Sequence, residues 1–392
     1  MFIIKRIGCR VCQLAFRLAT PFLPYREPCI LSSCDELGDR LLREKIDSVL
    51  IVTRRLPESA KKSLEQSKIS YVIYDKVQPN PTADNVEEGL KLYYESHCSA
   101  IIAIGGGSPI DCAKAVGARV AYPNKKIGQL GGPLRILKKI PTLIAIPTTA
   151  GTGSEVTLAA VISEPKKYKK YALMSFPLIP NYAILDASLT YSLPPHLTAT
   201  TGMDALTHAV EAYIGRSTTR KTRRLAIEAT QMIFENLEKA YLNGNDHKAR
   251  ENMLLASYKA GIVISISYVG YVHAIAHSIG GRYDTPHGLA NAVIMPHVLE
   301  SYGKSAHKKL YELGVAVGVA NKSDTYEIGA KRFIQAIKEL NARMNIPSSI
   351  ECIEEADIKE LAKYAESEAN PLYPVPRLMN TRELEKLYYK IK

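Results

Sequence analysis

The chain has 392 residues, of which 46% are hydrophobic and 23% charged, a globular composition that excludes disordered, collagen-like and coiled-coil proteins. Lysine and arginine outnumber aspartate and glutamate by 51 to 39, which gives a formal net charge of +12. Trp is absent and no nucleic-acid-binding motif is present, so we predict solvated basic faces and no nucleic-acid partner.

The N-terminal segment is basic and amphipathic. Its first 26 residues contain five positive charges and no acidic residue, as in a transit peptide, but no small-residue cleavage site follows. We expect residues 1–28 to form a helical extension that is retained and packs on the protein or lies on a surface. No run approaches the roughly 18–20 apolar residues of a membrane-spanning helix, so we predict no integral membrane segment and a cytoplasmic location.

Residues 40–190 alternate short β-rich runs with helical patterns, within a domain that we place at residues 29–190. The predicted strands are 49–53, 70–74, 100–104, 142–146 and 182–185, and the predicted helices include 86–95 and 111–120. Such alternation predicts a parallel sheet covered by helices, that is, an α/β N-terminal nucleotide-binding domain.

Beyond Pro194 and Pro195 the hydrophobic period changes to 3.6 residues. The predicted helices there are 197–214, 220–241, 248–262, 287–303, 326–343 and 380–391. We therefore expect an all-α C-terminal domain over residues 191–392, with the active cleft between the two domains, where α/β enzymes commonly bind ligands.

A glycine-rich loop connects the strand predicted at 100–104 to the next helix. It contains Gly105, Gly106 and Gly107. Glycines let the backbone approach an anion closely, and the N–H groups of a helix N-terminus attract negative charge. We expect Ser108 to cap the helix, with Asp111 completing a capping box. A pyrophosphate fits this loop, although an ordinary glycine turn remains the alternative because the pattern is neither G-x-G-x-x-G nor a Walker loop.

Two further polar segments follow predicted strands. Residues 147–155, which include Thr148 and Thr149, are rich in hydroxyl groups and glycine, and Asn80 follows the strand at 70–74. Each of these alone is most simply an ordinary polar loop. Two anion-friendly loops at the ends of neighbouring strands favour a dinucleotide.

A group of histidines and one aspartate predicts a metal site. Asp204 and His208 are spaced i and i+4, so both side chains emerge from one face of a helix. His273 and His277 repeat this spacing, and His287 opens a further helix. A single histidine is more often structural than a ligand, but buried ionisable groups are costly unless they share a partner such as a cation. One aspartate with three histidines suits Fe²⁺ or Zn²⁺, and residue type does not choose between them.

These residues together resemble the iron-containing (group III) alcohol dehydrogenase family. The matching stretches are 105–114, 147–155, 202–213, 273–277 and 286–291, within a resemblance that extends from about residue 20 to the C-terminus. The resemblance implies a dehydroquinate synthase-like fold, with an α/β N-terminal nucleotide-binding domain, an all-α C-terminal domain and a metal in the cleft between them.

The resemblance also implies a role for each matching residue. The metal ligands would be Asp204, His208, His273 and His287. His277 would lie just outside them as a catalytic residue beside the reacting groups. The cofactor would contact Gly105, Gly106, Gly107, Ser108, Asp111, Thr148, Thr149 and Asn80, with Lys170 or a neighbouring lysine nearby.

One departure from the family pattern concerns the choice between NAD and NADP. Members that prefer NAD carry an acidic residue after the first strand, in the order V-T-D, whereas here Val52 and Thr53 are followed by Arg54 and Arg55. Arginine binds phosphate through two hydrogen bonds, so we expect Arg54 to favour NADP over NAD. The alternative is that both arginines point to solvent and cofactor choice is relaxed.

The predicted activity is metal-dependent hydride transfer between a primary or secondary alcohol and NAD(P)⁺, or reduction of the corresponding aldehyde or ketone, by a homodimer or larger homo-oligomer. His277 is the expected proton relay. Three alternatives remain: a metal- and NAD-dependent lyase of the dehydroquinate synthase type, a metallohydrolase, and a non-catalytic nucleotide- or RNA-binding protein.

Overall fold

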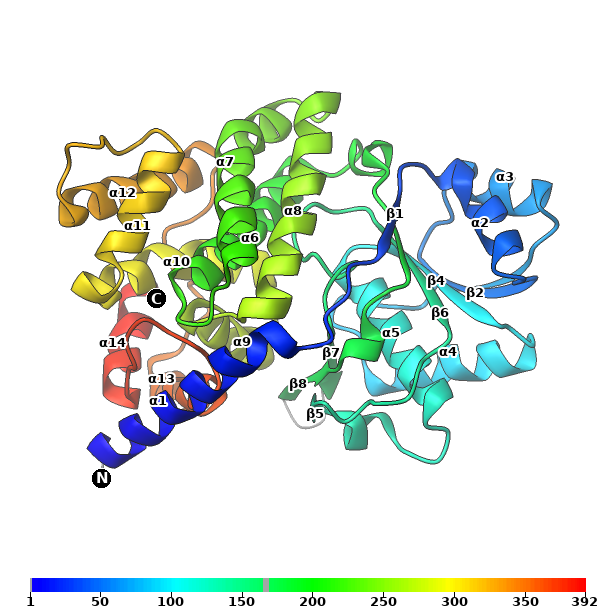
Figure 1. Ribbon diagram of the computed structural model, residues 1–392, viewed down its shortest axis with the longest axis horizontal. Coiled ribbons are helices and arrows are strands. Elements are labelled where there is room, and N and C mark those ends of the chain that lie inside the picture. The colour runs from blue at the N-terminus through cyan, green and yellow to red at the C-terminus, as the bar shows by residue number, and fades with distance from the viewer. Residues whose placement is uncertain (1, 165–168) are drawn as a thin grey trace. The chain divides into compact units, whose positions relative to one another are not determined.

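The computed structural model describes residues 2–164 and 169–392, which form two compact units (Figure 1). The α/β unit comprises Pro24–Leu193. The helical unit comprises Pro194–Lys392 together with the N-terminal segment up to Leu23. The basic N-terminal segment therefore belongs to the same unit as the C-terminal helices, although it precedes the α/β unit in the chain.

The α/β unit is built on a six-stranded sheet in which all paired strands are parallel. From edge to edge its strands are β1 (Cys29–Leu31), β9 (Tyr182–Ile184), β6 (Thr142–Pro147), β4 (Ala100–Gly105), β2 (Ser48–Val52) and β3 (Ser70–Tyr74). Because the strands are parallel, their carboxyl ends meet at one edge of the sheet, where ligands bind in open α/β sheets. The predicted parallel sheet is confirmed.

Helices cover both faces of this sheet. They are α2 (Leu37–Arg43), α3 (Glu58–Gln66), α4 (Ala83–Glu95) and α5 (Gly107–Ala121). Leu50 and Ile101 pack in one apolar core with residues of α4 and α5, whereas Ile51 and Ile102 pack in a second core with residues of α2 and α3. Alternate residues of each central strand thus enter opposite cores, which is why these strands contain uninterrupted apolar runs.

A second, three-stranded sheet lies within the same unit. Its strands, in order, are β5 (Gly132–Pro133), β8 (Lys169–Met174) and β7 (Ala159–Glu164), and β7 and β8 are antiparallel. This sheet was not predicted. Its strand β7 packs against α5, the helix that follows the glycine loop.

The helical unit contains α1 (Phe2–Ala19) and a C-terminal group of helices. The latter are α6 (Pro195–Ile214), α7 (Arg220–Leu242), α8 (His247–Ser267), α9 (Tyr271–Tyr283), α10 (His287–Tyr302), α11 (His307–Ala316), α12 (Tyr326–Arg343), α13 (Ile358–Ala369) and α14 (Thr381–Ile391). From Thr198 onwards most of α6 is buried, and at Gly202 a Cβ atom would lie 2.2 Å from the Leu237 side chain. Glycine at this position therefore allows α6 and α7 to pack closely.

Among the described residues, no single helix is long and apolar enough to cross a membrane. Helices α8 and α9 together have the necessary length and composition, but the chain bends by 100° between them.

The central position of β4 predicts different stability losses at two isoleucines of the same sheet. Replacing the buried Ile102 by alanine should lower the free energy of unfolding of the α/β unit by about 2–5 kcal/mol, because it leaves a cavity between β4 and its covering helices. The control Ile73→Ala, on the edge strand β3 at a position 39% exposed, should cost less than about 1 kcal/mol. Urea unfolding followed by circular dichroism measures both, and equal losses would contradict the burial of β4.

Candidate functional site

The glycine-rich loop lies at the carboxyl end of β4, between β2 and β6. Gly105 has a φ of +150°, and a Cβ atom there would lie 2.7 Å from Pro109 Cγ, so this position requires glycine. Gly106 is the N-cap residue of α5, and no side chain caps the helix. The first turn of α5 therefore begins at the edge of the sheet without a side-chain acceptor, which suits an anion at the helix N-terminus.

The predicted capping box of Ser108 and Asp111 is wrong. The helix begins at Gly107, so Ser108 lies inside its first turn instead of at the cap. Its Oγ atom accepts a hydrogen bond from the N–H of Asn80 at 3.3 Å. Asp111 Oδ2 accepts one from the N–H of Val161 on β7 at 2.9 Å. Both side chains thus connect α5 to neighbouring segments.

The two polar loops that were predicted to be neighbours are in contact. Gly105 lies opposite Pro147 in the β4–β6 register, and the N–H of Thr148 donates to the Gly105 carbonyl at 2.9 Å. A Cβ atom on Gly106 would lie 3.3 Å from the Thr149 side chain. The threonine hydroxyls of the second loop therefore border the glycine loop, where they can donate to an anion.

Asn80 and Lys170 join the same group. Asn80 Oδ1 accepts a hydrogen bond from Lys170 Nζ at 2.9 Å, while its N–H binds Ser108. Arg54 follows β2 and is exposed, and its Nε donates to the carbonyl of Val77 at 3.2 Å. Since β2 and β4 are parallel neighbours, Arg54 lies at the same edge of the sheet as the glycine loop.

Sequence reasoning missed a buried group of charges on and beside α5, formed by Asp111, Lys114 and Glu155. Lys114 is fully buried, and its Nζ donates to the carbonyls of Thr157 and Ala159 at 2.7 and 2.8 Å. Burial lowers the pKa of Lys114 to about 8 and raises that of Asp111 to about 6 and that of Glu155 to about 7, while attraction between the opposite charges opposes each shift. A lysine inside an otherwise apolar helical stretch was the available signal.

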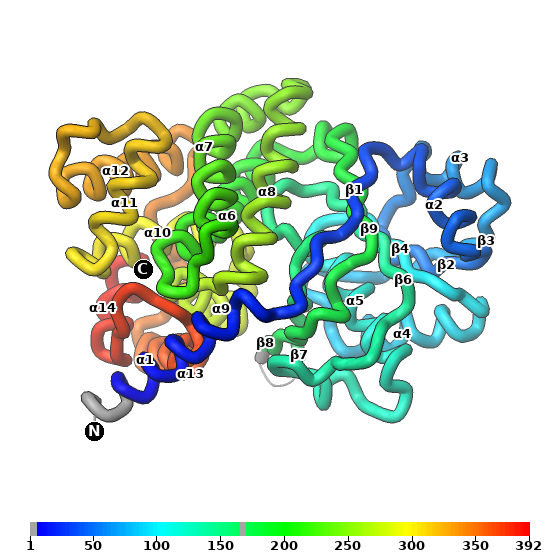
Figure 2. The backbone as a smooth tube through the Cα atoms, viewed as in Figure 1, coloured from blue at the N-terminus to red at the C-terminus, as the bar shows by residue number. Residues whose placement is uncertain are grey.

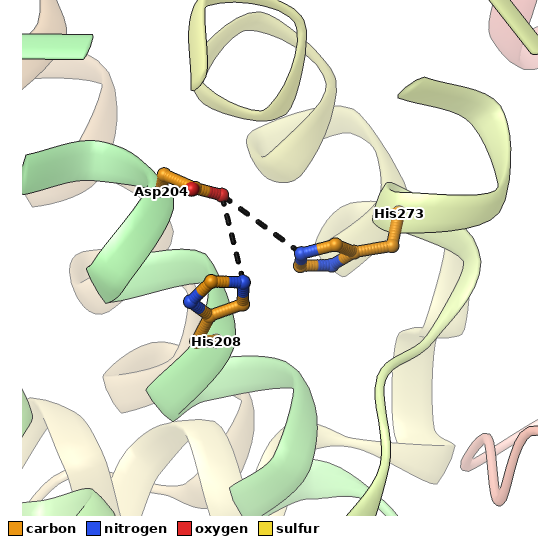
Figure 3. A group of neighbouring side chains, drawn as sticks. All are labelled: Asp204, His208 and His273. Atoms are coloured by element: carbon orange, nitrogen blue, oxygen red, sulfur yellow. Dashed lines mark ion pairs between the residues drawn. The ribbon is translucent and has the colours of Figure 1, made fainter. Parts of the chain in front are cut away.

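In the helical unit, Asp204 and His208 on α6 point toward His273 on α9 (Figure 3). All three are buried, and one donor atom from each lies within 4.8 Å of the others. The Nε2 atoms of His208, His273 and His287 lie 3.7, 3.9 and 3.6 Å from Asp204 Oδ1. These distances are too long for hydrogen bonds, but donor atoms that share a tetrahedral ion through bonds of about 2.1 Å are separated by about 3.4 Å. The buried donors of Asp204, His208 and His273 therefore fit a transition-metal cation, and His287 Nε2 lies at a similar distance from Asp204 Oδ1.

Glu211, which the sequence did not identify as a site residue, orients one histidine. Its Oε2 atom lies 2.6 Å from His273 Nδ1 and accepts from the N–H of Gly270 at 2.8 Å, while Oε1 accepts from the N–H of Val272 at 2.7 Å. This carboxylate occupies Nδ1 and leaves Nε2 facing Asp204. Glu211 is seven residues after Asp204 and hence on the same face of α6, a spacing that could have revealed it.

The pKa of His273 favours the neutral imidazole, which is the form that binds a metal. Burial, followed by repulsion from the neighbouring histidines, lowers the pKa of His273 well below its ordinary value, so its imidazole is neutral at pH 7. Burial raises the pKa of Glu211 to about 7, against the effect of its backbone hydrogen bonds. Asn291, a second residue that the sequence analysis did not assign, donates from Nδ2 to Asp204 Oδ1 at 2.7 Å.

His277 lies beside this cluster and has a carboxylate of its own. Its Nδ1 atom is 2.6 Å from Glu368 Oε1, which also accepts from the Tyr373 hydroxyl at 2.6 Å. The His277 ring stacks on that of His287, with centroids 5.2 Å apart. The side chain of His277 is partly exposed, in contrast to that of His273. Glu368 is 91 residues away in sequence, so no local pattern could have shown this pair.

Comparison with known proteins gives consistent matches over most of the chain. Residues 31–187 match the family model described as iron-containing alcohol dehydrogenase, and residues 198–391 match that of the C-terminal part of the Fe-containing alcohol dehydrogenase family. The 1,3-propanediol dehydrogenase of Citrobacter freundii is 37% identical over 83% of this chain and 84% of its own length. Alcohol dehydrogenase 4 of Saccharomyces cerevisiae is 39% identical over 86% of this chain and 88% of its own length.

A solved structure shows the same fold. A 1,3-propanediol oxidoreductase is similar with a TM-score of 0.90 and 33% identity, over 94% of this chain and 99% of the other. The predicted dehydroquinate synthase-like fold, with an α/β nucleotide-binding part followed by helices, is confirmed.

The buried charges beside the glycine loop predict a pH-dependent stability. Because the pKa of Glu155 is raised from 4.5 to about 7 on folding, the folded chain retains a proton that the unfolded chain releases. This group therefore lowers the free energy of unfolding as pH rises from 4.5 to about 7. Glu155→Gln does not ionise, so its stability relative to the wild type should increase by about 2–3 kcal/mol between pH 5 and pH 8.

Urea unfolding at the two pH values measures this difference. The matched control is Glu65→Gln, which makes the same substitution at a carboxylate that is mostly exposed in α3. A difference between Glu155→Gln and the wild type that is independent of pH would contradict the ionisation argument.

Proposed function

Because the chain belongs to the iron-containing alcohol dehydrogenase family, we propose that it transfers a hydride between a primary or secondary alcohol and NAD(P)⁺ at a bound Fe²⁺ or Zn²⁺, or reduces the corresponding aldehyde or ketone. The observation that carries this proposal is the convergence of three imidazole Nε2 atoms on Asp204 Oδ1. The relatives named above are dehydrogenases, so a lyase of the dehydroquinate synthase type is not favoured.

The proposed metal ligands are Asp204, His208, His273 and His287. When bound, the cation supplies Lewis acidity toward the alcohol or carbonyl oxygen, and the nicotinamide accepts or donates the hydride. Glu211 holds the His273 ring, and Asn291 holds the Asp204 carboxylate. The Glu211 contact fixes the His273 ring before a cation arrives, which reduces the reorganisation that binding requires. Asn291 Nδ2 also lies 3.1 Å from His287 Nε2, so the amide has to release that nitrogen for the cation.

We assign the proton transfer to His277. Its Nδ1 atom is held by Glu368, so Nε2 is the atom that gives a proton to the substrate oxygen or takes one from it. The Tyr373 hydroxyl donates to the same Glu368 oxygen and so restricts the carboxylate. His277 is partly exposed, as a group that exchanges protons with solvent must be.

The proposed dinucleotide site is the sheet edge around Gly105, Gly106, Gly107 and Ser108, together with Thr148, Thr149 and Asn80. The backbone of the glycine loop and the N-terminus of α5 suit the pyrophosphate. Asp111 is committed to the N–H of Val161, so we assign it to holding α5 in place. Arg54 is the proposed partner of a 2′-phosphate, which supports NADP over NAD. The family also supports a homodimer or larger assembly.

The assay of the proposed function uses protein reconstituted with Fe²⁺ or Zn²⁺. NADPH and NADH oxidation is followed with a panel of short aldehydes, and we expect activity that a chelator abolishes. His273→Ala should lose metal and activity together, because it removes a ligand. His277→Ala should keep the metal but lower kcat by about 10²–10⁴-fold, because it removes the proton relay. Metal content is measured by mass spectrometry.

The matched control is His297→Ala, a half-buried histidine on α10 that has no assigned role and should leave metal and turnover unchanged. Metal loss in His277→Ala would place that residue among the ligands. If neither cofactor is oxidised with either metal, the dehydrogenase assignment is wrong.

Cofactor preference is tested at Arg54. Arg54→Asp should lower the ratio of kcat/KM for NADPH to that for NADH by about tenfold or more, because it replaces a phosphate-binding guanidinium by a repelling carboxylate. Lys91→Asp makes the same charge change at an exposed position of α4 and should leave the ratio unaltered. An unchanged ratio in Arg54→Asp would show that Arg54 does not choose the cofactor.

A further inference from the structure

The N-terminal helix α1 has two opposite faces of different character. Cys9, Gln13, Phe16 and Thr20 recur at intervals of three or four residues and form the face that packs on the protein. A second row has the same spacing, and each of its members precedes a member of the first row by two residues: Ile7, Val11, Leu14 and Leu18. A displacement of two residues turns the direction by about 200°, so the second row points away from the protein.

Specific contacts hold the inner face of α1 on the helical unit. Gln13 Nε2 donates to the Tyr373 carbonyl at 2.7 Å, and Arg10 donates to the carbonyls of Val375 and Pro376 at 2.8 and 3.0 Å. Phe16 packs edge-on against Tyr268, with ring centroids 5.6 Å apart. In Figure 2 the α1 tube lies against the segment between α13 and α14 that supplies these carbonyls. The helix is thus an integrated part of the unit.

The outer face of α1 is an exposed apolar stripe. The exposed fractions of its residues are 59% for Ile7, 61% for Val11, 54% for Leu14, 65% for Leu18 and 86% for Phe22, which continues the row beyond the helix. Scattered exposed apolar side chains are ordinary, but the four from Ile7 to Leu18 recur along about three turns of α1 and form a continuous surface.

Arginines line one edge of this stripe. Arg6, Arg10 and Arg17 are separated by four and seven residues, which places them along one side of α1 between its two faces. No acidic residue occurs in the first 26 residues. One edge of the apolar stripe is therefore positively charged.

A second basic segment adjoins α1. The N–H of Arg216 donates to the Pro374 carbonyl at 2.6 Å, in the loop whose next two carbonyls bind Arg10. Exposed basic residues continue from there: Arg216, Arg220, Lys221, Arg223 and Arg224. The pKa of Lys309 is lowered to about 8 by burial first, then by Arg223, with smaller contributions from Arg17 and Arg216. Arginines of both segments thus lower the pKa of the same lysine.

The family match does not account for α1. The family models match residues 31–187 and 198–391, so the helix lies outside both. Its inner face contacts Tyr373, whose hydroxyl donates to Glu368 beside His277, but its outer face takes part in none of the contacts described for the donor cluster or the glycine loop. Its exposed face is therefore a property of this chain that the proposed catalytic function leaves unused.

We propose that α1, together with the basic segment 216–224, is a peripheral membrane-binding surface that takes the face of an anionic phospholipid bilayer. Ile7, Val11, Leu14, Leu18 and Phe22 enter the boundary between head groups and acyl chains, with α1 parallel to the bilayer plane. Arg6 and Arg17, which are exposed, and the exposed basic residues of the segment 216–224 meet the anionic head groups, whereas Arg10 is held by the carbonyls of Val375 and Pro376.

Charge favours a lipid surface over a second copy of this chain as the occupant. In a two-fold dimer the same patch meets itself, so the arginine edges and the segments at 216–224 would be brought together. These segments contain no acidic residue to neutralise them. An anionic bilayer supplies both the opposite charge and the apolar layer that the stripe requires.

The test is flotation of the metal-loaded full chain with phosphatidylcholine vesicles, with and without phosphatidylserine. We expect binding only to the anionic vesicles and its loss at high salt. Leu14→Asp/Leu18→Asp should reduce the apparent vesicle affinity by at least about tenfold, because it places carboxylates in the stripe. Arg6→Gln/Arg17→Gln should reduce it by about fivefold for each arginine removed.

Matched controls carry the same changes elsewhere. Leu137→Asp/Leu242→Asp alters two leucines that are 76% and 72% exposed, and Lys62→Gln/Lys91→Gln removes two exposed cations of the α/β unit. Both should bind anionic vesicles like the wild type. Circular dichroism confirms that each variant is folded.

Three results would overturn the proposal. One is the absence of binding to anionic vesicles at low salt, and another is equal binding of Leu14→Asp/Leu18→Asp and Leu137→Asp/Leu242→Asp. The third comes from light scattering without lipid. If the wild-type chain is an oligomer and Leu14→Asp/Leu18→Asp lowers its molar mass, the occupant of the stripe is a second copy of the chain. Since none of these readouts uses catalysis, failure here leaves the proposed function untouched.

Discussion

The helical unit depends on keeping the Asp204 carboxylate buried among imidazoles. Removal of such a group from water is costly, and its neighbours come from three helices, α6, α9 and α10. The two backbone N–H groups at the start of α9 bind Glu211, which in turn fixes His273. The junction between α8 and α9 therefore has to lie where it does, because moving it would separate both the carboxylate and the imidazole from their partners.

The α/β unit uses a related device beside its glycine loop. Lys114 is buried, yet its ammonium group reaches the carbonyls of Thr157 and Ala159. Asp111 reaches the N–H of Val161 on the same segment. These bonds attach α5 to β7 and so fix the direction of the helix N-terminus at the sheet edge. In both units, a buried charged side chain hydrogen-bonds to the backbone of another element. Glu211 does so with the start of α9, and Lys114 and Asp111 do so at β7, and these bonds position the candidate site residues.

Sequence patterns predicted the elements whose signal is local. The central strands are apolar on both faces and appear as β-branched runs, whereas β1 has three residues and β7 and β8 belong with β5 to a separate small sheet. The clustering of Asp204, His208 and His273 was predictable in part, because Asp204 and His208 share a helix face. Glu211, Asn291 and Glu368 were not, since their partners lie 62, 87 and 91 residues away. The capping box failed because the helix begins at Gly107, one residue before Ser108.

The two faces of the N-terminal helix differ in whether the packing of the unit explains them. Contacts of Gln13 and Phe16 suffice to explain why α1 packs on the helical unit. The row from Ile7 to Leu18 adds nothing to that packing, because apolar area contributes free energy only when something removes it from water. An exposed stripe beside arginines raises the free energy of the isolated chain in water. The proposed contact with an anionic bilayer removes this area from water and supplies the opposite charge.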